Sequence, residues 1–368
     1  MHRKAARMDG EIELVGGAFD INPQKSKQIG KELILDPKRV YRNYEELIEN
    51  ELKLPEGERM DFVSICTPNN WHYPIAKACL EAGFHVMCEK PMTLTSKEAR
   101  DLVKLVKKNR RVFGLMHTYP AYPMAKLARD IVKNGKIGKV RKVVVQYPQD
   151  WLATALEKTG QLQAAWRTDP KQSGASGCGG DIGVHAANLA EYVSGLKMTH
   201  LCVELTSFVK GRRLDDDVNC LVRFNSGARG VIHSSQVAVG EENNLAIWVY
   251  GETGGVEWHQ EDPNYLYLRH LGEPTQVWKR GNGYVGQSSA AAGRATRLPC
   301  GHPEGFIEAF ANNYRNFADT IRARILRVKV DPLMLDFPNV EDGLRGMLFI
   351  ETLIASAKSN QKWTKFKK

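Results

Sequence analysis

Asp61-Phe62-Val63-Ser64-Ile65-Cys66-Thr67-Pro68-Asn69 is the stretch that decides the fold, because a short apolar run ends in a turn at its carboxyl side. Such a run is typical of a buried strand in a parallel sheet. A helical pattern over residues 72–82 follows, and then a second strand, His85-Val86-Met87-Cys88, leads directly into Glu89-Lys90-Pro91. This alternation predicts a βαβ unit with polar residues at its strand ends.

The alternation of strands and helices extends over residues 11–118. It predicts further strands and helices over residues 14–19, 111–116, 1–8, 24–32, 44–52 and 95–109. Parallel strands joined by crossover helices are typical of a Rossmann-like sheet. We therefore predict a Rossmann-like dinucleotide-binding domain over residues 1–118.

The pattern changes after this first domain. A helix and a strand over residues 122–146 are followed by a glycine-rich stretch, a helix over 181–194, and several strands joined by short turns such as Asn225-Ser226-Gly227. Tight turns between successive strands predict antiparallel pairing. We therefore predict a substrate-binding and oligomerisation domain of the α/β class over residues 119–368, with a large, mostly antiparallel open sheet. Its last helix, over 340–358, can pack back on the first domain.

The composition limits the classes of partner. The formal charge of +10 is most concentrated in a lysine-rich tail, at residues 358, 362, 365, 367 and 368. We interpret this tail as a solvated end and not as a nucleic-acid surface. The sequence has no run of about 18 apolar residues to span a membrane, and its start lacks the apolar stretch of a secretion signal. We expect a soluble, cytoplasmic protein that binds neither nucleic acid nor membrane.

The seven cysteines predict neither disulfide bonds nor a metal site. They are an odd number spread along the chain without a CxxC pair, which fits a reducing cytoplasm. Zinc requires clustered thiolates and imidazoles, and the sequence has no such cluster. We expect no metal.

Polar residues follow several of the predicted strands, where a parallel sheet binds its ligands. Asp20 follows the strand over 14–19, where an acid can accept hydrogen bonds from the adenosine ribose and repel a 2′-phosphate, which favours NAD over NADP. A role in capping the next helix is the alternative. The turn Thr67-Pro68-Asn69 can carry its backbone past the cofactor. Glu89-Lys90 is a charged pair directly after an apolar strand. Because burial of charged groups costs free energy, we interpret this pair as functional. His117-Thr118-Tyr119 ends the last strand and either lines the cleft or bridges structural elements.

The segment Gly179-Gly180-Asp181-Ile182-Gly183-Val184-His185 places an acid and an imidazole four residues apart. On a helix, this spacing puts both side chains on one face. We expect Asp181 to raise the pKa of His185 or to fix its orientation, which suits general acid–base chemistry near neutral pH. A purely structural ion pair is the alternative.

Taken together, these motifs resemble the glucose–fructose oxidoreductase, inositol dehydrogenase and rhizopine-catabolism (Gfo/Idh/MocA) family. The resemblance covers nearly the whole chain and rests, in order, on Ile65-Cys66-Thr67-Pro68-Asn69, Cys88-Glu89-Lys90-Pro91, Trp166-Arg167, Gly180-Asp181-Ile182-Gly183-Val184-His185 and Val340-Glu341-Asp342-Gly343. It implies a Rossmann domain followed by an α/β domain whose open sheet commonly forms homodimers or homotetramers.

The resemblance also implies a role for each site residue. The lysine that matches Lys90 contacts the reacting hydroxyl and the nicotinamide ribose, and the Lys90–Pro91 bond is often cis in the family. The histidine that matches His185 takes the hydroxyl proton as hydride leaves for the nicotinamide, and the acid that matches Asp181 orients substrate or histidine. Trp166 and Arg167 correspond to a segment beside the sugar substrate, although ordinary loop packing would also explain them. Softer candidates for the pocket are Tyr147, Gln149, Asp150 and Trp151.

The sequence departs from the family pattern at its start. A Rossmann fold needs a first strand and a GxGxxG turn whose amides meet the pyrophosphate at a helix N-terminus. Neither precedes residues 14–19, and the glycines near 174–180 lie too far downstream. The expectation is that the start was assigned about 20 to 30 residues late, by the size of one strand and its loop. The intact mass of the native protein, compared with 41.3 kDa, tests this.

The leading hypothesis is an NAD(H)-linked dehydrogenase that oxidises a secondary hydroxyl of a sugar, glycoside or inositol. One alternative is a non-catalytic binding or regulatory protein on the same fold, because a fold does not fix a function. Another is an enzyme that keeps its cofactor bound and transfers hydride between two sugars. Titration with NAD and NADP separates the first two, because binding without turnover would favour the regulator.

Overall fold

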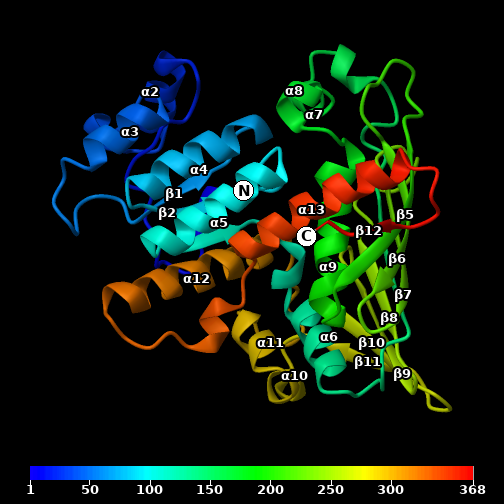
Figure 1. Ribbon diagram of the computed structural model, residues 1–368. Coiled ribbons are helices and arrows are strands. Elements are labelled where there is room, and N and C mark those ends of the chain that lie inside the picture. The colour runs from blue at the N-terminus through cyan, green and yellow to red at the C-terminus, as the bar shows by residue number, and fades with distance from the viewer. Residues whose placement is uncertain (368) are drawn as a thin grey trace.

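The computed structural model describes residues 1–367 and contains two sheets with helices lying between them (Figure 1). The smaller sheet has three parallel strands in the order β1-β2-β3: β1 (Phe62–Ile65), β2 (His85–Cys88) and β3 (Phe113–Leu115). Every residue of β2 and β3 is buried, as expected for apolar strands covered on both faces. The predicted parallel, Rossmann-like sheet is thus confirmed.

Helices cover both faces of this sheet, and one of them comes from the far end of the sequence. On one face lie α4 (His72–Glu81) and α5 (Ser96–Asn109), which begins at a capping box formed by Thr95 and Glu98. On the other lie α1 (His2–Ala6) and α12 (Phe306–Ile325), where Met87 packs with Tyr314 and Phe317 in one apolar cluster. Burial of such side chains contributes roughly 1.5–3 kcal/mol each, so α12 is an integral layer of the first domain.

The strand predicted over residues 14–19 is wrong. Gly17 forms only an isolated parallel bridge with Val40, and the surrounding residues are irregular. A strand requires a neighbour that satisfies its backbone groups, and within residues 1–367 the only strand beside β1 is β2. Two successive glycines further weaken an extended segment. Two short helices follow this region, α2 (Pro23–Glu32) and α3 (Tyr44–Glu51).

The larger sheet has nine strands in the order β11-β10-β9-β8-β4-β7-β6-β5-β12. All neighbours are antiparallel except β4 and β7, which confirms the predicted mostly antiparallel sheet. The sequence pattern missed the last three strands. The strands are β4 (Lys142–Pro148), β5 (Met198–Thr206), β6 (Asp217–Phe224), β7 (Arg229–Ser235), β8 (Ala246–Tyr250), β9 (Gly254–His259), β10 (Tyr265–His270), β11 (Gln276–Lys279) and β12 (Thr364–Lys365).

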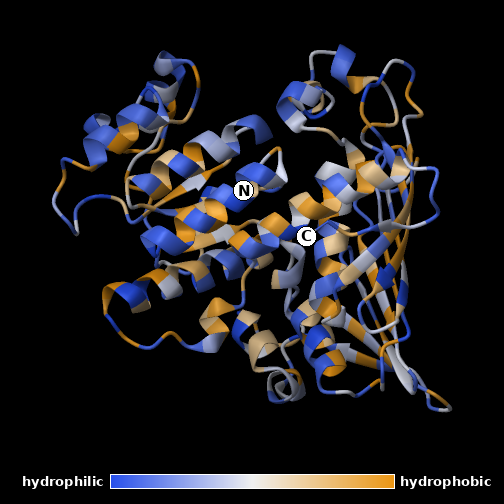
Figure 2. Cartoon of the chain, viewed as in Figure 1, coloured by the Kyte–Doolittle hydropathy of each residue, from blue (hydrophilic) through white to orange (hydrophobic). Residues whose placement is uncertain are grey.

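Only the inner face of the large sheet carries helices in the described part of the chain (Figure 1). These helices are α6 (Pro123–Lys133), α9 (Val184–Ser194) and α13 (Val340–Ala357). Hydrophobic and hydrophilic residues alternate along the strands (Figure 2), as expected for a sheet with one face packed. In β6, for example, Cys220 and Val222 are buried while Leu221 is exposed.

Helix α13 lies between the two halves of the molecule and contacts both α5 and β5 (Figure 1). The remaining short helices are α7 (Leu162–Arg167), α8 (Pro170–Ser173), α10 (Gly283–Ser288) and α11 (Ala290–Ala295). Single turns are η1 (Pro37–Arg39), η2 (Asn69–Trp71), η3 (Tyr119–Ala121), η4 (Leu156–Lys158), η5 (Gly179–Gly183) and η6 (Pro332–Leu335). Among residues 1–367, no helix is both long and apolar enough to cross a bilayer.

Candidate active site

Lys90 and Asp181, which are 91 residues apart in the sequence, form an ion pair at the carboxyl end of β2. The Nζ of Lys90 donates to the Oδ1 of Asp181 at 2.7 Å and to its backbone oxygen at 2.6 Å. Only about a seventh of each side chain is exposed, at 14% and 16%. The Lys90–Pro91 bond is cis, as the family resemblance implied. The two charged residues named from separate motifs therefore belong to one site.

The second carboxylate oxygen of Asp181 is held from the large domain. The Nε of Arg167 lies 3.4 Å from Oδ2, and Gln236, just after β7, donates its amide to the same oxygen at 2.9 Å. Burial alone would raise the pKa of Asp181, but the charges of Lys90 and Arg167 and these hydrogen bonds outweigh it and lower the pKa to about 2. Asp181 is therefore ionised throughout the neutral range.

His185 pairs with His117 and not with Asp181. The Nδ1 atoms of the two rings are 3.0 Å apart, and the rings meet edge to face with centroids 4.9 Å apart. The direct contact expected between Asp181 and His185 is absent from the described interactions. The reason is local: Asp181 lies in η5, a π-helical turn, which spaces residues differently from the α-helix that the spacing argument assumed.

The pKa of His185 is lowered well below its ordinary value, which is the opposite of what the sequence led us to expect. Burial is the main cause, followed by the positive charge of Lys90 and by His117. Burial and Lys90 also lower the pKa of His117, to about 3. Both rings are therefore neutral at neutral pH, and each can act only as a hydrogen-bond partner or as a base.

A row of hydroxyl and amide groups borders His185, and one member of it, Asn243, was not predicted. The ring of Tyr119, in η3, packs edge-on against His185 with centroids 4.9 Å apart. Its hydroxyl bonds that of Tyr147, which donates to Asn243 Oδ1 at 2.8 Å. Gln149 donates to the same atom at 2.6 Å. Tyr119 belongs to the segment expected to line the cleft with His117, and Tyr147 and Gln149 were softer candidates, whereas Asn243 was missed.

The turn that carries Asp181 is fixed by Asp215. The carboxylate of Asp215 accepts hydrogen bonds from Ser176 Oγ at 3.0 Å, Gly177 N at 2.9 Å and Gly179 N at 2.8 Å. A Cβ on Gly177 would lie 2.4 Å from the backbone oxygen of Asp215, so glycine is required there. The glycine-rich stretch therefore allows the close packing that fixes the turn of Asp181.

Thr67, Pro68 and Asn69 form the turn after β1, and His72 ties this turn to the Lys90 segment. Asn69 is buried and donates to the backbone oxygen of Ser173 at 2.9 Å. The fully buried ring of His72 lies 2.8 Å from the backbone oxygen of Pro91 and 3.0 Å from that of Thr67. This buried bridge was also missed, because a histidine at a helix start gives no signal of its partners.

The carboxylate of Glu89 contacts the N-terminal helix and also accepts a hydrogen bond from the backbone N–H of Lys90 at 3.0 Å. Its Oε1 lies 2.7 Å from the Nε2 of His2, whose Nδ1 lies 2.8 Å from the hydroxyl of Tyr314. Burial would lower the pKa of His2, but hydrogen bonds to Cys66 and Glu89 raise it to about 9. Burial would raise the pKa of Glu89, yet His2 and Lys90 lower it. Glu89 therefore joins α1 to the site as part of an ion pair.

The other predicted residues lie at the edges of the site. Asp20 accepts from Asn22 N at 2.9 Å and pairs with Lys25 at 2.9 Å, close to the capping role named as its alternative. Asn22 itself is the cap of α2. Arg167 stacks on Trp166, with its guanidinium carbon 4.2 Å from the ring centroid, so these two residues form a joint surface beside Asp181.

Two buried polar atoms after β1 have no hydrogen-bond partner within residues 1–367: Thr67 Oγ1 and Asn70 Oδ1. They lie at the carboxyl end of the parallel sheet, where a dinucleotide binds in a Rossmann fold. An unpaired hydroxyl and an unpaired amide oxygen at this edge fit the nicotinamide half of such a cofactor. Within residues 1–367, no GxGxxG turn joins a strand of the parallel sheet to a helix, where it would hold the pyrophosphate; the GxGxxG pattern at Gly281-Asn282-Gly283-Tyr284-Val285-Gly286 lies after β11, at the start of α10.

Two family models match the chain. Residues 1–117 match the model described as oxidoreductase family, NAD-binding Rossmann fold, and residues 125–257 match the GFO/IDH/MocA C-terminal domain. The uncharacterized oxidoreductase YfiI of Bacillus subtilis is 33% identical over 369 residues, which cover 100% of this chain and 93% of that protein.

Solved structures with the same architecture are also similar in sequence. An oxidoreductase from Sinorhizobium meliloti is 42% identical, with a TM-score of 0.87 and coverage of 99% of this chain and 95% of that one. An inositol dehydrogenase homolog from Azotobacter vinelandii, complexed with NADH and myo-inositol, is 34% identical, with a TM-score of 0.90 and coverage of 99% and 93%.

Proposed function

The chain belongs to the Gfo/Idh/MocA family of NAD-binding oxidoreductases, and from this membership we propose that it oxidises a secondary hydroxyl of a sugar, glycoside or inositol. The observation that carries the proposal is the convergence of a lysine, an ionised acid and a neutral histidine at the strand ends of the NAD-binding sheet. The Azotobacter vinelandii homolog with NADH and myo-inositol supports the substrate class.

Each residue has a part that its geometry allows. The ammonium of Lys90 stabilises negative charge on the substrate oxygen, and Asp181 holds that ammonium in place. His185 is neutral because its pKa is lowered, so it can accept the hydroxyl proton. When bound, NAD supplies the acceptor for hydride from the carbon that carries this hydroxyl. Arg167 and Trp166 offer a guanidinium and an aromatic face, which suit a polyhydroxylated ring.

The test is turnover of the purified full chain with a panel of sugars, glycosides and inositols, followed as NADH formation. We expect at least one substrate, and no measurable turnover in Lys90→Ala or His185→Ala. Lys77→Ala, which removes a half-exposed lysine of α4, is the matched control and should retain wild-type turnover. Wild-type activity in both site variants would refute the proposal, as would cofactor binding without turnover across the whole panel.

A further inference from the structure

His117 and His185 form a buried imidazole pair at the centre of the site. His117 follows β3, and His185 lies in the first turn of α9. Their exposed fractions are only 1% and 7%, and their Nδ1 atoms are 3.0 Å apart. Solvent therefore has little part in deciding which nitrogen of each ring carries a proton.

The distance between the two Nδ1 atoms restricts the tautomers. A hydrogen bond needs one N–H and one lone pair, and a neutral imidazole has a single N–H. If both rings are neutral, one ring donates through Nδ1 and keeps a lone pair on Nε2, while the other accepts through Nδ1 and carries its proton on Nε2. The two histidines are thus forced into opposite tautomers.

Other groups around His185 do not compete for its Nδ1. The nearby charges are those of Lys90 and Asp181, and these two are bonded to each other. The hydroxyls of Tyr119 and Tyr147, whose rings pack on His185, bond each other and Asn243. Within residues 1–367, the ring of His185 forms no hydrogen bond other than the one that it shares with His117.

We infer that His117 is a positioning residue that accepts the Nδ1–H of His185 and so leaves the Nε2 lone pair of His185 for the substrate hydroxyl proton. The inference rests on the proposed function, in which His185 is the base. With NAD bound, the carbon that carries the hydroxyl would give up its hydrogen as hydride to the nicotinamide, and Nε2 of His185 would take the hydroxyl proton. The Nδ1–H of the resulting imidazolium still has a lone pair on His117 to bond. In the opposite arrangement, Nε2 of His185 would already be protonated and could take no proton.

The first test reads the tautomer directly and needs no turnover. Nitrogen-15 NMR of the histidine-labelled full chain at neutral pH should show His185 protonated at Nδ1 and unprotonated at Nε2, with the reverse for His117. His117→Phe should leave His185 as a mixture of tautomers. An Nε2-protonated His185 in the wild-type protein would overturn the inference, whatever the activity measurements give.

The second test separates positioning from folding and from the base itself. We expect His117→Phe to lower kcat by roughly tenfold to a hundredfold with KM changed less than threefold, as typical for loss of an acid–base contribution. His117→Asn retains an acceptor near the position of Nδ1 and should recover part of the loss. His302→Asn, at an exposed loop histidine, is the control. Wild-type kcat in His117→Phe contradicts the inference. Wild-type kcat in His185→Ala contradicts the proposed function instead.

Discussion

Asp20 is the residue on which cofactor preference depends in our proposal. Its carboxylate lies at the start of the α2 region, bonded to Asn22 N and paired with Lys25. Its hydrogen bond from Asn22 and its contact with Lys25 lower its pKa, so it is negatively charged at neutral pH. A fixed negative charge near the adenosine ribose would repel the 2′-phosphate of NADP.

Asp20→Asn keeps the oxygen that Asn22 N bonds while removing the charge. We expect the ratio of kcat/KM for NAD over NADP to fall by about tenfold, equivalent to about 1.4 kcal/mol. Lys25→Met removes the neighbouring positive charge and should change the ratio in the opposite direction. Steady-state kinetics with both cofactors measure this, and equal ratios in all three proteins would exclude Asp20 from the cofactor site.

Buried neutral histidines make stability depend on pH. The pKa of His85 is lowered to about 4 by burial and by Arg111 and Arg324, and that of His117 is lowered to about 3. Because the unfolded chain titrates near 6.5, it binds more protons than the folded chain below that pH, and stability is lost as the pH falls. The raised pKa of His2 affects stability in a different pH range. Its contribution to the free energy of unfolding is complete below pH 6.5 and is lost as the pH rises through about 9.

We therefore expect the free energy of unfolding to fall between about pH 6.5 and pH 5 by up to about 1.4 kcal/mol per pH unit for each such histidine. His85→Asn can still accept a hydrogen bond from the Val112 N–H. It should reduce the pH dependence of the free energy of unfolding by the contribution of one histidine. Denaturant unfolding at several pH values measures it. A stability that is flat over this range would show that the rings are protonated in the folded state.

At the residue level, the sequence identified Lys90, Asp181 and His185 because each follows a recognisable strand or glycine pattern. It could not reveal His117 as the partner of His185, since 68 residues separate them and tautomer pairing leaves no periodic trace. Asn243 was missed for the same reason.

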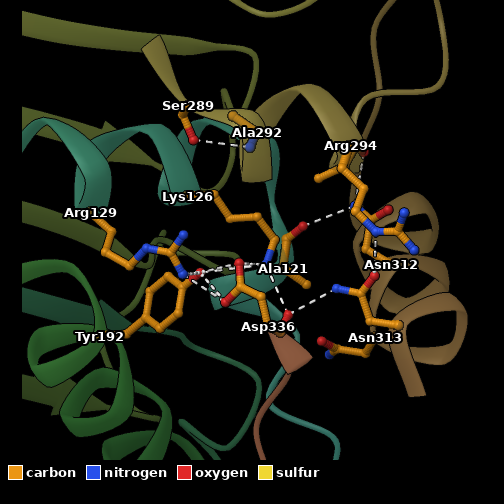
Figure 3. Close-up of polar contacts among 12 residues, drawn as sticks. Ala121, Lys126, Arg129, Tyr192, Ser289, Ala292, Arg294, Asn312, Asn313 and Asp336 are labelled. Carbon is orange, nitrogen blue, oxygen red and sulfur yellow. Dashed lines mark hydrogen bonds and ion pairs between the residues drawn. The ribbon is translucent and has the colours of Figure 1, made fainter. Parts of the chain in front are cut away.

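At the scale of elements, α6, α9 and η6 are joined by one buried charged cluster (Figure 3). Lys126 and Arg129 both contact the carboxylate of Asp336, at 2.8 Å and 2.6 Å, and Tyr192 donates to it at 3.0 Å. Lys126 is 3% exposed and Asp336 14%. Asn316 of α12 donates to the backbone oxygen of Asp336, which ties the cluster to the first domain.

Asp336→Asn would leave two cations without their shared anion, one of them fully buried. We expect a loss of about 3–5 kcal/mol in the free energy of unfolding, as for other broken buried pairs. Lys126→Met should cost less, because Arg129 still neutralises Asp336. Glu341→Gln, which breaks an exposed pair with Lys107, is the control and should cost less than about 1 kcal/mol. Equal losses in Asp336→Asn and the control would refute this account.

Element boundaries were predicted best where local chemistry fixes them, as with the capping box of α5. The π-helical turn η5 could not be predicted, because the glycine required just before it, Gly177, packs against Asp215, which lies 38 residues further along the chain. The failed strand over 14–19 has the same origin: an apolar run becomes a strand only beside a partner.

At the scale of the whole molecule, the outer face of the large sheet carries an apolar row across four neighbouring strands. The strand register pairs Leu221 with Val231, Val231 with Val144, and Val144 with Trp248, all on the face without helices. Leu221 is 46% exposed. A contiguous apolar surface of this kind is typical of an interface between protein chains.

We propose that this face joins two or more copies of the chain. Light scattering coupled to size exclusion should give a homodimer or homotetramer for the wild type. Leu221→Glu with Val231→Glu should shift the protein toward the monomer without loss of secondary structure. Asn219→Glu, on the same face beside the row, is the control for charge alone. A monomeric wild type would refute the proposal.

The position of α12 has a consequence for anyone who wishes to recombine this protein with a relative. The cofactor half cannot be exchanged as a continuous cassette ending near residue 118, because the layer containing Tyr314 and Phe317 is supplied almost two hundred residues later in the chain. A chimera that changes cofactor preference must transplant residues 306–325 together with the N-terminal segment. Otherwise, Met87 and its neighbours would face a helix selected for a different sheet.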